Sequence, residues 1–121
     1  MGGERRRMTR SLFRAAARSY EESCWCPAAD IYRGDRGWLI KFDLAGVRPQ
    51  DIHLAVEGRR LVVRGVRRDL SVVEGQQAYS MEIAYNRFQR SIELPCDLMD
   101  VEIRSEYRDG MFLVSISTGG H

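Results

Sequence analysis

Residues 51–66 read DIHLAVEGRRLVVRGV, and this stretch decides the fold class of the chain. Polar and apolar residues alternate over its first seven positions, which predicts a strand with one face in the core and one in solvent. The Gly58 turn signal and the apolar run behind it then predict a second strand. In the first strand the predicted core-facing side chains are Ile52, Leu54 and Val56, and the predicted solvent-facing side chains are Asp51, His53 and Glu57.

The same period of two recurs along the chain after Pro27. Turn signals built on glycine, proline and aspartate separate the segments, and no stretch of helical period lies between them. Short strands at this spacing predict an all-β fold, either a sandwich or a barrel. The predicted strands are residues 28–33, 37–44, 51–57, 60–66, 78–85, 87–95, 101–107 and 111–116.

Residues 1–24 differ from the rest of the chain in charge and in period. Six arginines oppose one glutamate up to residue 18, so the chain begins with a basic arm on a mildly acidic body. Residues 8–20 have helical spacing and predict a short amphipathic helix. Such an arm fits a solvated segment, a contact with nucleic acid or anionic membrane, or a mitochondrial targeting segment. The apolar side of the predicted helix includes Met8, Leu12, Phe13 and Tyr20.

Length, cysteines and motifs narrow the class of protein. A chain of 121 residues makes one domain, and no apolar run approaches the ~20 residues of a membrane span. The arginines at the start precede no apolar segment, so we expect no secretory signal. Three cysteines, an odd number, then indicate free thiols in a reducing compartment, and we expect a cytoplasmic protein. Phosphate-loop and acyl-transfer motifs are absent, so we predict no catalytic residue, no metal site and no cofactor.

Five short motifs follow one another in order from Trp25 to Ile116. With them the chain resembles the small heat-shock proteins, the alpha-crystallin family, of the bacterial type. The departures from the family pattern are Ala45 for proline, Asn86 for glycine, Ser105 for alanine and Phe112 for leucine. The motif residues are Trp25, Pro27, Asp30, Ile31 and Tyr32; Leu44 to Val47; Leu61, Gly65 and Arg67; Phe88, Arg90, Leu94 and Pro95; and Ser105, Gly110, Met111 and Phe112.

The resemblance implies an immunoglobulin-like β-sandwich over residues 25–117, preceded by the arm at 1–24 and followed by a vestigial tail at 118–121. The Asp109-Gly110 turn requires positive φ, and we expect Asn86 to adopt the left-handed conformation in place of glycine.

The resemblance also implies a homodimer formed by strand exchange. The loop that begins at Gly65 would carry a strand to the partner subunit, where residues 28–32 would receive it. Alternation places Arg90 on the face of two large apolar residues, so it needs a carboxylate partner or an interface. The predicted interface residues are Leu70, Val72 and Val73 of the crossing strand, with Ile31, Phe88 and Arg90.

The function that the resemblance implies is that of an ATP-independent chaperone, a holdase, whose partners are other copies of the chain and partly unfolded client proteins. The predicted client-binding residues are Met8, Leu12, Phe13 and Tyr20 of the arm. The alternatives are an adaptor like the CS-domain co-chaperones, which binds one specific partner, and nucleic-acid binding through the arm. We expect no specific nucleic-acid partner, because the arm has no reading motif.

A groove between two edge strands receives the I-x-I pair of the C-terminal tail in relatives. The groove residues predicted here are Ile52, Leu54, Val101 and Ile103. Val114 and Ile116 are expected to face the core instead, and no apolar pair follows them. We therefore expect dimers or small assemblies.

Overall fold

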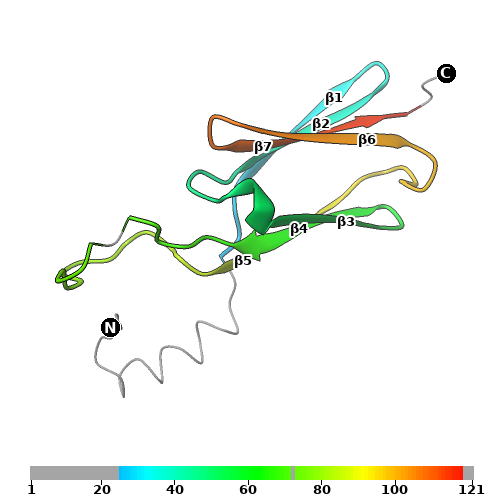
Figure 1. Ribbon diagram of the computed structural model, residues 1–121. Coiled ribbons are helices and arrows are strands. Elements are labelled where there is room, and N and C mark those ends of the chain that lie inside the picture. Colours follow the sequence, from blue (N-terminus) through cyan, green and yellow to red (C-terminus); the bar gives the residue numbers. More distant parts are fainter. Residues whose placement is uncertain (1–24, 72, 119–121) are drawn as a thin grey trace.

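Two antiparallel sheets pack face to face in the computed structural model, which describes residues 25–71 and 73–118 (Figure 1). The four-stranded sheet has the order β1-β2-β7-β6 and the three-stranded sheet the order β3-β4-β5. A short 3-10 helix, Pro49–Asp51, precedes β3. The strands are β1 (Ala29–Gly34), β2 (Gly37–Asp43), β3 (Ile52–Glu57), β4 (Arg60–Val66), β5 (Arg87–Glu93), β6 (Glu102–Arg108) and β7 (Met111–Ser117).

The core lies between the sheets and is built by the period of two. Along β7, Phe112, Val114 and Ile116 are buried, which confirms that Val114 and Ile116 face the core. Along β3, every second side chain is half-buried against the core, as the alternation predicts. The all-β sandwich is therefore confirmed. The predicted helix at residues 8–20, Val72 and the last three residues lie outside the described residues.

The turn between β6 and β7 joins two motifs that are far apart in the sequence. Asp109 and Gly110 both have positive φ, 54° and 79°, as a two-residue Asp-Gly hairpin requires. The amide of Leu44 donates a hydrogen bond to the carbonyl oxygen of Gly110 at 2.9 Å. The hydroxyl of Tyr107 donates to the carbonyl oxygen of Leu44, also at 2.9 Å. The turn therefore holds the segment that leads from one sheet to the other.

The strand predicted at residues 78–85 is wrong. The chain from 67 to 86 forms no strand over its described residues, although Tyr79, Met81 and Ile83 keep the alternating apolar pattern. A strand needs a neighbour for its backbone groups, and β4 and β5 already pair with each other. The loop instead extends away from the sandwich (Figure 1).

The left-handed conformation expected for Asn86 is also wrong. Asp109 is the one non-glycine residue with positive φ in the described part of the chain. The carbonyl oxygen of Asn86 accepts from the amide of Arg67 at 3.0 Å, which extends the β4–β5 ladder by one pair. The backbone bends at Asn86 without the positive φ that glycine would allow.

Gly65 lies where the 3-10 helix and β5 approach β4 most closely. A Cβ atom at this position would overlap the carbonyl oxygen of Asp51 and lie 2.7 Å from Cζ of Phe88. Gly34, at the end of β1, has its nearest neighbour at 3.8 Å and makes a matched control. We expect Gly65→Ala to lower the free energy of unfolding by about 1–3 kcal/mol, as overpacking does, and Gly34→Ala to change it little. Urea denaturation measures both changes. Equal urea midpoints for the two variants would mean that β4 shifts to accommodate the added methyl group at no cost in stability.

Candidate functional site

Exposed apolar side chains gather on the loop at residues 67–86 and on β1. Among the described residues, eight large apolar side chains are exposed, and seven of them lie in these two places. Tyr79 is fully exposed, and the others are between 44% and 69% exposed. Groups of large apolar side chains left in water mark interaction surfaces, and the loop and β1 are two separate candidates (Figure 1). The seven are Ile31, Tyr32, Leu70, Val73, Tyr79, Met81 and Ile83.

Arg67 holds the two ends of the loop. Its Nε donates to the carbonyl oxygen of Ala84 at 2.8 Å and its Nη1 to that of Ala45 at 3.0 Å. Its guanidinium lies 3.8 Å from the ring centroid of Trp25 and 5.9 Å from that of Tyr85. The sequence predicts Arg67 only as a motif residue. Its hydrogen-bond acceptors could not be predicted, because they are backbone carbonyl groups, which every residue has.

Trp25 pairs with the outer edge of β5. Its amide donates to the carbonyl oxygen of Arg87 at 2.9 Å, and the amide of Gln89 donates to its carbonyl oxygen at 3.1 Å. Its ring meets Phe88 edge to face, with the centroids 5.5 Å apart. Phe88 is 1% exposed. The prediction that Phe88 faces a partner subunit is therefore wrong, because this side chain is part of the core of one chain.

Arg90 is half-buried on β5 and donates from Nη1 to the carbonyl oxygen of Pro27 at 3.0 Å. Among the described residues no carboxylate forms an ion pair with it. A backbone carbonyl takes the place of the expected carboxylate partner, and the expected position of Arg90 in a dimer interface stays a prediction. Arg90 therefore anchors the segment that crosses from β5 to β1.

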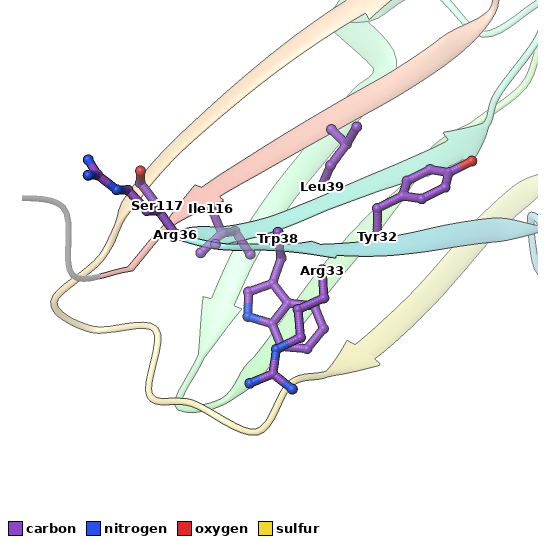
Figure 2. A pocket seen from close by; sticks show the side chains of 9 residues that line it. Tyr32, Arg33, Arg36, Trp38, Leu39, Ile116 and Ser117 are labelled. Carbon is purple, nitrogen blue, oxygen red and sulfur yellow. The ribbon is translucent and has the colours of Figure 1, made fainter.

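The outer edge of β1 has no neighbouring strand among the described residues. Ile31 and Tyr32 lie on it, and Lys41 on β2 places its Nζ 4.9 Å from the ring centroid of Tyr32. At the tip of the β1–β2 hairpin, Arg33 lies over the ring of Trp38 at 5.1 Å and helps to line an open pocket of about 340 Å³ (Figure 2). An unpaired edge with apolar side chains is suited to pairing with an added strand.

The four predicted groove residues lie at two other edges. Ile52 and Leu54 are on β3, the edge of the three-stranded sheet. Ile103 is on β6, the edge of the four-stranded sheet, and Val101 comes just before this strand. All four are half-buried and pack against the core. The predicted client-binding residues Met8, Leu12, Phe13 and Tyr20 lie outside the described residues, as does Val72.

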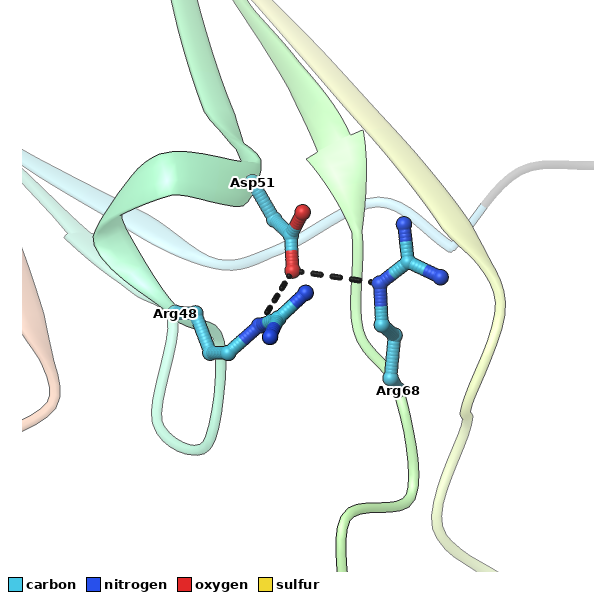
Figure 3. Close-up of polar contacts among 3 residues, drawn as sticks. All are labelled: Arg48, Asp51 and Arg68. Carbon is cyan, nitrogen blue, oxygen red and sulfur yellow. Dashed lines mark hydrogen bonds and ion pairs between the residues drawn. The ribbon is translucent and has the colours of Figure 1, made fainter.

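Asp51 was predicted to face solvent, and this is wrong, because two arginines cover it (Figure 3). Its Oδ2 accepts from Nε of Arg48 at 2.9 Å and from Nε of Arg68 at 3.2 Å. The hydrogen bond from Arg48 contributes most to holding the pKa of Asp51 below its ordinary value of 3.8; burial opposes this effect, and Arg68 adds to it. The residue is the only buried charged side chain in the described part of the chain.

Two cysteines fall within the described residues, Cys26 exposed and Cys96 half-buried, and both are free thiols. No group of three or more histidine, cysteine or acidic side chains that could hold a metal ion is present in residues 25–71 and 73–118. Over the same residues, no helix has the length and apolar character needed to cross a membrane.

Comparison with known proteins gives these features a context. The sequence profile of the Hsp20/alpha crystallin family matches residues 30–119. The chain belongs to this family. The match runs from β1 to just beyond β7, so it covers the whole sandwich.

Curated relatives in the family are distant in sequence. The chain is 28% identical to small heat shock protein C2 of Rickettsia felis over 74% of its own length and 58% of the relative. It is 26% identical to spore protein SP21 of Stigmatella aurantiaca, over 74% of its own length and 53% of the relative. The chain thus spans little more than half the length of these relatives.

Solved structures of small heat shock proteins share the fold. The structure of hspA from Xanthomonas axonopodis matches with a TM-score of 0.66 and 25% identity, over 80% of this chain and 97% of that one. A small heat-shock protein from Xylella fastidiosa matches with a TM-score of 0.67 and 22% identity, over 82% of this chain and 91% of that one. The immunoglobulin-like sandwich implied by the motifs is therefore the alpha-crystallin domain.

The low pKa of Asp51 predicts how stability depends on pH. The folded state binds fewer protons here than the unfolded state, so the carboxylate stabilises the fold fully above about pH 4 and loses this effect as the pH falls through its folded pKa. We expect Asp51→Asn to lower the urea midpoint at neutral pH. The difference in midpoint between this variant and the wild type should disappear in acid.

Glu102→Gln is the control for this effect, because Glu102 pairs with Arg104 on the surface. Exposed pairs contribute about 0–1 kcal/mol, so this variant should follow the wild type at every pH. If the urea midpoint of Asp51→Asn stayed below that of the wild type in acid, the loss of stability would come from packing and not from charge.

Proposed function

We propose that this member of the Hsp20/alpha crystallin family is an ATP-independent chaperone, a holdase that binds partly unfolded proteins and keeps them from aggregating. The observation that carries the proposal is the match to the family over the whole β-sandwich, together with the apolar side chains that lie outside the proposed dimer contact, Leu70 and Val73 of the loop. Family membership supports it, because small heat shock proteins are known as ATP-independent chaperones rather than enzymes.

The kind of side chain also favours many clients over one. Met8 of the arm has an unbranched, polarisable side chain, and methionine is common on surfaces that accept varied partners. A co-chaperone adaptor of the CS-domain kind needs a fixed, specific surface, and it remains the alternative. The arm residues Met8, Leu12, Phe13 and Tyr20 would add to the client-binding surface, since their predicted helix presents them on one side.

The proposal includes a homodimer formed by strand exchange. The open edge of β1 would receive the crossing strand, with Ile31 and Tyr32 beside it. Within the loop, Tyr79, Met81 and Ile83 are exposed at every second position, which suits a strand that gains a neighbour only in the dimer. This pattern favours residues 79–83 over the segment at Leu70 and Val73 as the strand that crosses.

The half-buried residues at the edges of β3 and β6 would form a second contact. Ile52, Leu54, Val101 and Ile103 offer apolar area beside two sheet edges. The family resemblance implies that an apolar tail pair binds at this place. We propose that apolar peptide segments of another chain bind there.

Aggregation of a heated model enzyme tests the holdase. We expect the full chain to suppress light scattering at equimolar subunits without nucleotide, and ATP to change nothing. Replacing Met8, Leu12 and Phe13 by serine should raise the amount of chaperone needed several-fold, whereas Met99→Ser, an exposed site away from the loop, should not. No suppression by the wild type would remove the holdase and favour the adaptor.

The mass of the particle in solution tests the exchanged strand. We expect Met81→Asp combined with Ile83→Asp to raise the dissociation constant of the dimer more than about tenfold, because an unpaired carboxylate in an interface costs several kcal/mol. Leu70→Asp combined with Val73→Asp makes the matched control and should leave the mass unchanged. Analytical ultracentrifugation measures both. The reverse result would assign the crossing strand to residues 70–73, and no change in either variant would exclude the loop from the dimer.

A further inference from the structure

Arginines gather at one end of the outer face of the three-stranded sheet. Arg64 on β4 and Arg87 on β5 are exposed, and neither forms an ion pair within the described residues. In the sheet register, Arg64 lies between His53 of β3 and Gln89 of β5, and Arg87 lies opposite Val66. Arg64 and Arg87 are therefore diagonal neighbours on one face, close enough for both to contact one extended ligand.

The buried carboxylate of Asp51 holds two further arginines at this end of the sheet and cancels the charge of only one of them. Arg68 follows the end of β4, and it shares Asp51 with Arg48 (Figure 3). Their side chains are 53% and 40% exposed, so their remaining donors reach solvent. Asp69, next in the chain, accepts hydrogen bonds from Ser71. Asp69 keeps its negative charge, so four arginines against two carboxylates leave a net charge of +2, and we name Arg48, Arg64, Arg68 and Arg87 the arginine face.

The opposite end of the same sheet is balanced. There Arg60 lies between Glu57 and Glu93 in the register. On β6, Arg104 pairs with Glu102 at 2.9 Å and Arg108 with Glu106 at 3.6 Å. The uncompensated charge is thus a local property of the arginine face and does not follow from a net charge of only +2.

We propose that the arginine face binds the phosphate backbone of nucleic acid without regard to sequence. Arginine guanidinium groups form paired hydrogen bonds with phosphate oxygens, and Gln89 beside Arg64 supplies a further donor. Such contacts hold a backbone in place but carry no information about its bases.

The neighbours on this face argue against other anionic partners. Ala55, Gln89 and Ser91 are exposed there, and the exposed large apolar side chains lie elsewhere, on the loop, on β1 and at Met99. A membrane-binding face would present aromatic or leucine side chains to the lipid. An acidic protein partner would need apolar anchors at the centre of its interface. Among the described residues no exposed large aromatic side chain lies on this face, so the contact would be with the backbone and not with the bases.

Fluorescence anisotropy with a labelled oligothymidylate tests the proposal over a range of salt concentrations. The test variant is Arg64→Gln combined with Arg87→Gln, and the control is Arg104→Gln combined with Arg108→Gln, which removes the same net charge. Glutamine keeps most of each side chain, and circular dichroism checks that both variants fold. For four phosphate contacts on a single strand, the slope of log K against log salt is about −3, and loss of two contacts makes it shallower by about 1.4.

We expect this shallower slope and weaker binding in the test variant, and wild-type behaviour in the control. An equal loss of affinity in both variants would mean that binding depends on net charge alone. Wild-type affinity in both variants would assign binding to the arm. Either outcome overturns the proposal. Anionic phospholipid vesicles and polyglutamate serve as parallel probes. Binding that depends on the arginine face but is confined to one of these would also overturn it. Suppression of aggregation is a separate measurement, so failure here leaves the holdase untouched.

Discussion

The guanidinium group of Arg67 is the contact on which the layout of the surface depends. It stacks on Trp25 and donates to the carbonyl oxygens of Ala45 and Ala84, so three distant stretches of chain meet on one side chain. A planar group with five donors is suited to this, since it can satisfy carbonyls at its rim while its face covers an aromatic ring. The two ends of the long loop are thereby fixed to the sandwich, and the loop leaves the fold at a defined place.

The unequal size of the two sheets determines where the chain can still form contacts. A sheet of four strands faces a sheet of three, and the strands at the margins keep unpaired backbone groups. Trp25 occupies the outer edge of β5, whereas no strand in residues 25–71 and 73–118 pairs with the outer edge of β1. Proteins usually protect such an edge, because it can pair with another chain. The exposed edge of β1 and the exposed loop belong to the same molecule. The proposed dimer, in which the loop of each copy pairs with β1 of the other, requires this arrangement.

The sequence predicted the sandwich well because the period of two is a local property of each strand. Seven of the predicted strands are present, and β4 has the predicted bounds. Residues 78–85 have the same pattern, yet form no strand, because pairing depends on a neighbour that this chain does not provide. Asp51, Phe88 and Arg90 show the same limit. Their surroundings come from the 3-10 helix, from Trp25 and from Pro27, and no spacing rule brings those segments to them.

The two tryptophans of the chain sit at opposite functional places, and this makes the protein its own spectroscopic probe. Trp25 lies between Arg67 and Phe88 at the root of the loop, and Trp38 lies beneath Arg33 near the tip of the β1–β2 hairpin. Fluorescence from Trp25 therefore reports on whether the ends of the 67–86 loop stay attached to the sandwich. Fluorescence from Trp38 reports on binding at the β1–β2 hairpin. Single-tryptophan versions of the chain separate these two signals without any attached dye.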